Sequence, residues 1–520
     1  MKKTLAALIA ALTLGCATTE SAVPPAPEKP SAPATPPSAP PSTPAPAPGS
    51  PPTPDADFRA QKPAPLPGTP TFNAPVPVMK KLKNGTEVWV IENPAIPVVA
   101  VEVLIKSGVN AEPIAKAGLA DLVVSLLDEG TKTRPSAKLA EAIEDLALEL
   151  NANAGREDIR LHMNSLTETL PQALDLMADV LLNPAFKPED VDRVKALKIT
   201  ALEQKKGTPY ALAADEASRL LFGAKHPWGQ PDGGTPQTLR SITPGDLQKF
   251  HQTWFRPNNA FIAVSGDVKA DQIVKLLDER LASWKAKPLP ALNLPPLPEL
   301  KARTVTFVDK PNTTQSQVWV SGRLPLTAKD PDALTLRTIN FALGGLFTSR
   351  LNMNLRENKG YSYGVFSRVE AARTFGTMTA MGGIVAKNTA EALKEYEDEL
   401  ARFASGGVTE EELARSKNAY VRTMPSRLET NDAMASAYAT AAFYELGADY
   451  YKTLPEKIAA ITPADAARVA KIVTADRWPV IVVGPAEENA EKVKKMELGP
   501  MEVKTIPSSG GAPGAPVGVK

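Results

Sequence analysis

Hydrophobic and polar residues alternate along several short segments of the chain, and this period-two pattern predicts β-strands. KKLKNGTEVWVIENPAIPVVAVEVLIKSG (80–108) predicts two strands around an Asn-Gly turn, followed by a longer strand over 98–105. NANAGREDIRLHMNSL (151–166) predicts a second pair of strands, and FIAVSGDV (261–268) predicts another. Because these strands lie far apart in the sequence, the pattern favours an α+β fold over a simple meander.

Helical periodicity fills the segments between the predicted strands. Apolar residues recur every three or four positions in AGLADLVVSLLDEG (117–130), SAKLAEAIEDLALEL (136–150), the long region 170–206, and ADQIVKLLDERLASW (270–284). We therefore expect a helix in each of these four segments.

Two segments of the chain recur, which indicates an internal duplication. The segment 242–267, which begins ITPGDLQKF, matches 461–486, which begins ITPADAARV. The segment 187–202, KPEDVDRVKALKITAL, matches 409–424, TEEELARSKNAYVRTM. Because the two offsets, 461 minus 242 and 409 minus 187, are nearly equal, we predict a tandem duplication of a roughly 200-residue α+β unit.

Proline-rich and flexible segments divide the chain into parts. Residues 17–74 are mostly Pro, Ala, Ser and Thr, a composition that predicts an extended tether. A second proline-rich stretch, 285–302, predicts a linker between an N-terminal domain (75–284) and a C-terminal domain (303–500). Residues 501–520 are predicted to be a flexible tail.

The N-terminus has the pattern of an export signal. Lys2 and Lys3 precede an apolar core that is too short to span a bilayer as a stable helix, and the core ends at Cys16. A lone cysteine after a glycine at this place resembles a bacterial lipobox, which predicts a signal peptide over 1–16 and lipidation of Cys16. Ala17 after the cysteine indicates an outer-membrane lipoprotein that faces the periplasm. The alternative is a general secretory signal with an incidental cysteine.

Charge and cysteine content narrow the function classes. A formal net charge of +1 gives no electrostatic reason to expect nucleic-acid binding. Cys16 is the only cysteine, so the mature chain can form no internal disulfide.

About residues 75–495 of the chain resemble the pitrilysin/insulinase family of zinc metallopeptidases, in its processing-peptidase-like branch. The resemblance rests on the duplication together with NGTEVWVIENPAIPVVAVEVLIKSG, LNANAGREDIRLHMNSL and LGGLFTSRLNMNLRENKGYSYGVFS. It implies a tandem pair of α/β-sandwich units that form one half of a clamshell.

The zinc-binding positions of this family are altered here. Active members carry His-x-x-Glu-His on a helix, where the two histidines bind zinc and the glutamate activates water. GLADLVVSLLDEGT places Asp121, Val124 and Ser125 at those three positions. Glu203 falls near the distal zinc ligand, but we interpret it as a solvated helix residue. Asp121 and Ser125 share a helix face, but they are weak ligands for any other metal. The chain itself is therefore expected to bind no metal or other cofactor.

No replacement catalytic group is evident in the sequence. His162, His226 and His251 are not spaced three or four apart, so no local pair can hold a metal. No nucleophile-elbow motif accompanies a Ser-His-Asp arrangement. Gly344 and Gly345 are expected to allow tight turns, and no phosphate-binding motif accompanies them.

The second domain keeps a pair of residues that the resemblance assigns to catalysis. Arg356 and Tyr363 in LNMNLRENKGYSYGVFS match a family arginine and tyrosine that lean toward the zinc site. A guanidinium can hold a substrate carbonyl, and a phenol can donate a hydrogen bond to an oxyanion. Without the family, both would be interpreted as ordinary surface or core residues.

The resemblance implies a non-zinc subunit of a heterodimeric zinc endopeptidase. Zinc is then expected in a paralogous partner subunit, and the substrates are peptides. A catalytically inactive scaffold or peptide-binding lipoprotein of the same fold is the alternative, and a peptidase with an unconventional site is a third possibility. A neighbouring gene for a paralogue with intact His-x-x-Glu-His would favour the heterodimer.

Overall fold

The computed structural model describes residues 72–505. The predicted signal peptide with Cys16, nearly all of the tether and most of the tail lie outside the described residues. Within this part of the chain, no helix combines the length and the hydropathy needed to cross a bilayer.

The first domain is built on a six-stranded sheet with the order β1-β2-β6-β3-β5-β4. Only β2 and β6 pair in parallel, and the remaining neighbours are antiparallel. The strands are β1 (Val78–Lys81), β2 (Glu87–Glu92), β3 (Val98–Ile105), β4 (Glu149–Ala154), β5 (Ile159–Leu166) and β6 (Ala260–Gly266).

The second domain repeats this sheet with the order β12-β7-β11-β8-β10-β9. The parallel pair β7–β11 takes the place of β2–β6. The strands are β7 (Val305–Asp309), β8 (Gln315–Leu324), β9 (Ser362–Ala371), β10 (Gly376–Val385), β11 (Val480–Gly484) and β12 (Met501–Thr505).

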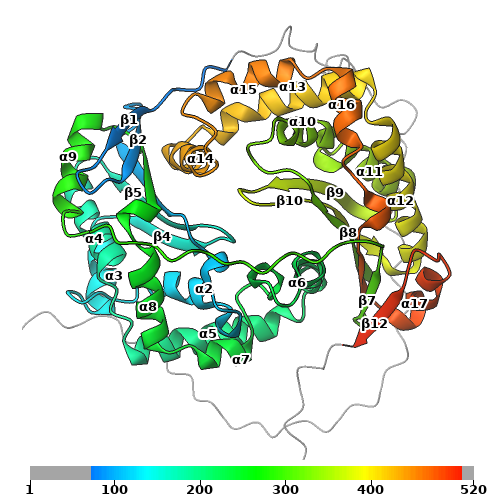
Figure 1. The fold of residues 1–520 in the computed structure, drawn as a ribbon, viewed down its shortest axis with the longest axis horizontal. Helices are drawn as coiled ribbons and strands as arrows, with labels where there is room; N and C mark the ends of the chain where they lie inside the picture. Colours follow the sequence, from blue (N-terminus) through cyan, green and yellow to red (C-terminus); the bar gives the residue numbers. More distant parts are fainter. Residues whose placement is uncertain (1–71, 506–520) are drawn as a thin grey trace, which may run out of the picture. The chain divides into compact units, whose positions relative to one another are not determined.

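Helices surround both sheets (Figure 1). The first domain has η1 (Val109–Ala111), η2 (Ile114–Lys116), α2 (Leu119–Val124), α3 (Ser136–Asp145), α4 (Leu170–Leu182), α5 (Pro188–Lys205), α6 (Pro209–Phe222), η3 (Pro227–Gly229), α7 (Pro236–Ser241), α8 (Pro244–Trp254), η4 (Pro257–Asn259) and α9 (Ala270–Arg280). The second has α10 (Pro331–Asn340), η5 (Phe341–Gly345), α11 (Arg350–Asn352), η6 (Met353–Asn358), η7 (Ala386–Asn388), α12 (Thr389–Gly406), α13 (Glu410–Arg427), α14 (Asn431–Phe443), α15 (Tyr450–Ala459), α16 (Pro463–Ala470), η8 (Ala475–Arg477) and α17 (Ala486–Lys494).

The predicted duplication is confirmed by these elements. Helices α5 and α13 have equal lengths and are separated by the offset that the sequence repeat predicts, and α8 and α16 begin at the offset of the other repeat. The fold is α+β, as predicted, with five strands of each sheet in equivalent places. The sixth strand differs: β1 precedes its sheet and pairs antiparallel to β2, whereas β12 ends the second domain and pairs parallel to β7.

Several predicted boundaries are wrong. The sequence predicts a tail from 501, but residues 501–505 form β12. The predicted tether reaches 74, but Ala74 is buried against α14. The helix predicted over 136–150 ends at Asp145, and β4 begins four residues later.

Two predicted helices are shorter than the periodicity suggests. The region 170–206 is broken between α4 and α5, where Pro184 cannot continue a helix. Helix α2 has only six residues, because the backbone N–H groups of Leu126 and Leu127 bond three residues back and tighten the chain into a turn.

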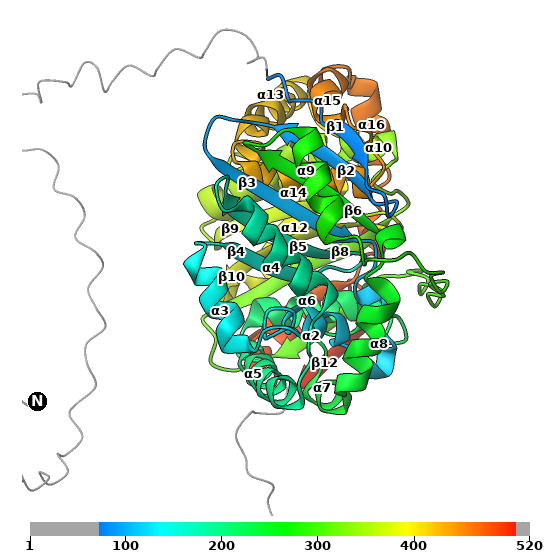
Figure 2. The same cartoon turned by 90° about the vertical axis from the view of Figure 1, so that its left-hand side faces the viewer.

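One face of each sheet is covered by helices of its own domain, and the other face is covered by one helix of the other domain. Helices α4 and α9 lie on the outer face of the first sheet, toward the viewer in Figure 2, and α14 packs against β3 and β6 on the inner face. Helix α6 of the first domain packs reciprocally against β8 and β11 of the second. Helices α6 and α14 start at the same offset as α5 and α13, so the exchange is symmetric.

This exchange explains the apolar character of the central strands. In β3, Val99, Val101 and Val103 enter the core of the first domain, whereas Ala100 and Leu104 face α14. A strand buried on both faces requires apolar residues at nearly every position. Glu102 is the buried exception.

Glu102 belongs to a polar cluster between the two domains. His162 on β5 lies between Glu102 and Asp432, with Nδ1 3.1 Å from the Glu102 carboxylate and Nε2 2.9 Å from that of Asp432. The hydrogen bond and charge of Glu102, together with Asp432, raise the pKa of His162 despite its partial burial. Arg160 also approaches Glu102, at 3.6 Å. The cluster attaches the first turn of α14 to the first sheet.

Replacing Tyr438 should destabilise both domains together. Tyr438 on α14 is fully buried, and its hydroxyl donates a hydrogen bond to the Pro75 carbonyl. We expect Tyr438→Ala to lower the free energy of unfolding by about 3–5 kcal/mol, and Tyr438→Phe by only about 1 kcal/mol. Urea unfolding followed by circular dichroism measures both values. Two separate transitions in the wild type would contradict a shared core.

Stability at the His162 cluster should fall as the pH rises. A raised pKa in the folded state means that the contribution of protonated His162 is complete below its ordinary pKa of about 6.5 and is lost as the pH rises through the folded value. The difference in unfolding free energy between wild type and His162→Gln should therefore be largest at pH 6 and shrink by pH 9. A difference that does not change with pH would contradict this role.

Candidate functional site

The helix that resembles the zinc helix is held by a buried carboxylate. Gly118 starts α2 with a φ of 92°, and a Cβ there would lie 2.5 Å from the Gly233 carbonyl oxygen, so only glycine fits. Glu112 accepts hydrogen bonds from the backbone N–H groups of Gly118 (3.0 Å) and Ala120 (2.6 Å). Burial raises the pKa of Glu112 to about 8, and the charges of Asp121 and Asp232 add to this effect. The sequence analysis did not single out Glu112, because this residue precedes α2 in the chain and meets the start of the helix only in the folded structure.

The three altered zinc positions have other structural partners. The Asp121 carboxylate pairs with the Lys198 ammonium on α5 at 2.6 Å. Val124 is buried in the domain core, and the Ser125 hydroxyl donates to the Asp121 carbonyl at 2.8 Å. The Lys198 ammonium therefore lies beside Asp121, and the Ser125 hydroxyl bonds to a carbonyl of its own helix.

Glu203 does not join these residues. Its carboxylate pairs with Lys206 at 2.7 Å, and both side chains are partly exposed. Instead, the face of α5 that packs toward Asp121 carries Lys198 and Leu202. This donor set does not fit zinc, because it offers one carboxylate that is already paired with lysine. Within residues 72–505, no group of three His, Cys, Asp or Glu residues is placed to hold a metal.

The other two histidines have structural partners. His226 accepts a hydrogen bond from the Trp228 backbone N–H at 3.1 Å, and burial lowers its pKa to about 4. His251 bonds through Nε2 to the Leu181 carbonyl at 2.8 Å, and burial lowers its pKa to about 4 as well. Both rings are therefore neutral at neutral pH, and they support local packing.

Arg356 and Tyr363 lie near the start of the edge strand β9. Arg356 is on η6, a π-helical segment of a kind that is frequent at functional sites. Its guanidinium stacks over the Phe347 ring at 4.6 Å and lies 3.2 Å from the Glu357 carboxylate. Tyr363 is 83% exposed, beside a register irregularity between β9 and β10. The Tyr363 hydroxyl is thus free to meet a ligand, whereas the guanidinium of Arg356 is held by Phe347 and Glu357 and is only partly exposed.

Two aromatic residues accompany this pair and were missed in the sequence. Phe347 and Phe366 are each about half exposed, although large apolar side chains are usually buried. Phe366 stands opposite Met381, so it lies on the face of the second sheet that α6 covers. The sequence does not distinguish these residues from core phenylalanines.

Gly344 and Gly345 do not form the expected tight turns. They end the π-helical segment η5, and a Cβ on Gly344 would lie 2.3 Å from the Ser367 backbone nitrogen. Gly344 therefore lets this segment approach β9 closely, and the approach fixes the strand that carries Tyr363.

The outer hairpins of the two sheets meet at their turns. Glu157, in the turn between β4 and β5, accepts hydrogen bonds from the Arg373 backbone N–H (2.9 Å) and the Thr374 hydroxyl (2.6 Å), in the turn between β9 and β10. Both hairpins end in an edge strand, β4 or β9. An edge strand has free backbone groups, which can pair with an extended peptide.

Comparisons with known proteins agree with this architecture. A family model described as Insulinase (Peptidase family M16) matches residues 87–214, and one described as Peptidase M16 inactive domain matches residues 241–420. The chain is 25% identical over 387 residues to a Bacillus subtilis protein named uncharacterized zinc protease YmxG, which covers 74% of this chain and 92% of that protein. It is 26% identical over 352 residues to a Helicobacter pylori protein named non-peptidase homolog YmxG, which covers 67% and 80%.

Solved structures share the fold. A structure titled peptidase M16 inactive domain, from Pseudomonas fluorescens, superposes with a TM-score of 0.74 at 22% identity over 79% of this chain and 98% of that one. The periplasmic protease PqqL of Escherichia coli superposes with a TM-score of 0.65 at 18% identity, over 82% of this chain but only 49% of its own. Since these two family models match parts of both repeats, the chain belongs to the insulinase family of peptidases, family M16.

Proposed function

We propose that this chain is the non-zinc subunit of a heterodimeric zinc endopeptidase, and that it helps to bind and orient peptide substrates. The observation that carries the proposal is an asymmetry between the two domains. The zinc positions of α2 are filled by the Asp121–Lys198 ion pair and buried Val124. In contrast, Tyr363 remains exposed and Arg356 partly exposed, beside two aromatic rings that are each about half exposed.

The side chains of Arg356 and Tyr363 have the chemistry needed to assist catalysis on a partner subunit. A guanidinium presents several donors to a peptide carbonyl, and a phenol can stabilise an oxyanion that forms on a neighbouring subunit. Phe347 and Phe366 offer apolar contact to substrate side chains. The zinc and the water that it activates would then come from the partner subunit.

The length relation to PqqL supports a two-chain assembly. The superposition covers only about half of the PqqL chain, so two chains of this fold together would match the size of PqqL. We further propose that the chain is anchored to the outer membrane through lipidated Cys16 and faces the periplasm. The Pro/Ala-rich segment would hold the domains away from the lipid.

A catalytically inactive peptide-binding or scaffold lipoprotein is the second candidate. It is favoured by the relative named as a non-peptidase homolog. The two functions differ in one respect: only the heterodimer requires Arg356 and Tyr363 for turnover.

The isolated chain should bind no stoichiometric zinc and should cleave no peptide. The reason is that Lys198 and Val124 stand where a metal and its base are needed. Plasma emission spectroscopy of purified protein measures the metal, and a casein-derived peptide mixture measures cleavage. Proteolysis by the single chain that a chelator abolishes would contradict the proposal.

In the complex co-purified from the native membrane, Arg356→Ala and Tyr363→Phe should lower kcat by about 10²- to 10³-fold, as for the loss of one oxyanion donor. Zinc content should not change, because neither residue holds the metal. Arg477→Ala on η8 and Tyr450→Phe on α15 are controls of the same residue types, since neither element packs against β9 or η6.

Wild-type turnover in both variants would reject the helper role. Unchanged peptide binding together with absent turnover in the wild-type complex would favour the scaffold.

A further inference from the structure

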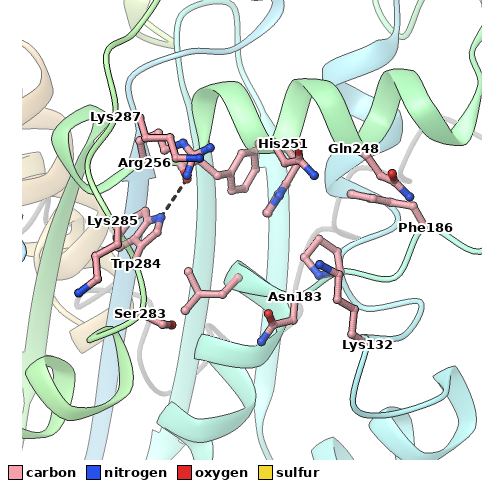
Figure 3. A pocket seen from close by; sticks show the side chains of 14 residues that line it. Lys132, Asn183, Phe186, Gln248, His251, Arg256, Ser283, Trp284, Lys285 and Lys287 are labelled. Carbon is pink, nitrogen blue, oxygen red and sulfur yellow. Dashed lines mark hydrogen bonds between the residues drawn. The ribbon is translucent and has the colours of Figure 1, made fainter.

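A cavity of about 470 Å³ lies on the outer side of the first domain, beside α8 (Figure 3). The rings of His251, Phe255 and Trp284 border it, but they are almost fully buried in the packing of that domain. Lys132 and Lys285 on its rim are exposed and do not point toward one another. The described lining of this cavity is therefore a gap between packed elements and not a binding site.

A polar side chain that is fixed at both ends lies instead in the second domain. Asn352 is fully buried, at the end of α11 and directly before η6. Its Nδ2 donates a hydrogen bond to the Phe347 carbonyl at 2.7 Å, and its Oδ1 accepts one from the Val365 backbone N–H at 3.2 Å. Because the nitrogen end of the amide only donates and the oxygen end only accepts, these two partners fix the orientation of the side chain.

The two partners of Asn352 support Arg356 and Tyr363. The centre of the Phe347 ring lies 4.6 Å from the guanidinium carbon of Arg356, so the Phe347 backbone determines where that ring can meet the guanidinium. Val365 is fully buried on β9, two residues after Tyr363, at the end of the regular pairing with β10. Asn352 therefore ties the residue that stacks on Arg356 to the strand that carries Tyr363.

The main chain of η6 has a separate attachment. Asn354 on η6 donates hydrogen bonds to the carboxylates of Glu395 (2.9 Å) and Glu399 (3.0 Å) on α12. These bonds hold η6 on α12, but neither carboxylate lies on β9 or on the loop before α11. What remains for Asn352 to set is the placement of that loop relative to β9.

A second buried asparagine holds β9 without this link. Asn340 directly precedes η5, as Asn352 precedes η6. Its Nδ2 donates to the Ser367 carbonyl at 3.0 Å, and its Oδ1 accepts from the Ser367 hydroxyl at 2.6 Å. Because both of these bonds end on β9, Asn340 stabilises the strand alone and provides a matched control for Asn352.

We propose that Asn352 is a positioning residue that sets the place of the Arg356 guanidinium relative to the Tyr363 phenol. The proposal rests on the helper role proposed above for this pair. Two groups that act on one carbonyl need a fixed separation, and a misplacement of about 1 Å can lower a rate about 10²-fold. Asn352→Leu nearly keeps the volume of the side chain but removes both hydrogen bonds, whereas Asn352→Asp keeps only the bond from the Val365 N–H.

In the complex co-purified from the native membrane, Asn352→Leu should lower kcat about 10²-fold with little change in KM, because the two groups are misplaced while the peptide still binds. The control Asn340→Leu should lower kcat by less than about tenfold, because its bonds do not reach the residue that stacks on Arg356. When Arg356→Ala is already present, the further loss caused by Asn352→Leu should shrink to about tenfold or less, since Asn352 acts through the pair.

Hydrogen exchange in the isolated chain checks the same link without any turnover. The Val365 amide should exchange at least about tenfold faster in Asn352→Leu than in wild type, and at nearly the wild-type rate in Asn352→Asp. Far-UV circular dichroism shows whether each variant is folded. If Asn352→Leu does not fold, Asn352→Asp carries the test, with the Val365 amide still protected and kcat still lowered.

Two results would overturn the positioning role. One is an equal fold-loss of kcat from Asn352→Leu with and without Arg356→Ala, which is the mark of a general loss of stability. The other is an unchanged exchange rate at Val365 in folded Asn352→Leu. Wild-type turnover in Arg356→Ala and Tyr363→Phe would reject the helper role itself, and this failure is separate because exchange at Val365 does not depend on turnover.

Discussion

The reciprocal exchange of two helices is the constraint on which the rest of the structure depends. Each sheet has one face that its own domain leaves bare, and α14 or α6 from the other domain covers that face. Neither domain can therefore bury its central strands alone, and the apolar area involved makes separation costly. The same exchange fixes the β4–β5 hairpin relative to the β9–β10 hairpin, because Glu157 joins their turns. Any ligand of these edges meets a preset geometry.

Much of the architecture could be predicted from the sequence, since the relevant signals are local. The strand pattern at 98–105 and the Asn-Gly turn placed three strands, and the repeated segments revealed the duplication through their nearly equal offsets. The exchange could not be predicted, because an apolar strand does not reveal which helix covers it. The boundary at 501 was missed because β12 is a short edge strand with no buried residue, so its sequence carries no pattern of buried positions.

At the candidate site, the sequence identified which residues to examine but not which side chains they contact. It located Asp121, Val124 and Ser125 through a resemblance, yet the Lys198 contact and the Glu112 cap depend on tertiary packing. Likewise, Arg356 and Tyr363 were found from their pattern, whereas the exposure of Phe347 and Phe366 is visible only once η5, η6 and β9 are in place. The pattern of residues along the chain does not show which side chains are buried or which distant residues they contact.

The ion pair between α2 and α5 also limits how this chain can change. A histidine introduced at 121 alone would meet the ammonium of Lys198, which repels a divalent cation and leaves the new ligand without its metal. The intermediate sequences between this helix and a working metal helix would thus gain nothing until several positions had changed together. Restoring a metal site in this helix would therefore require replacing Lys198 along with the ligand positions, because its ammonium lies beside Asp121.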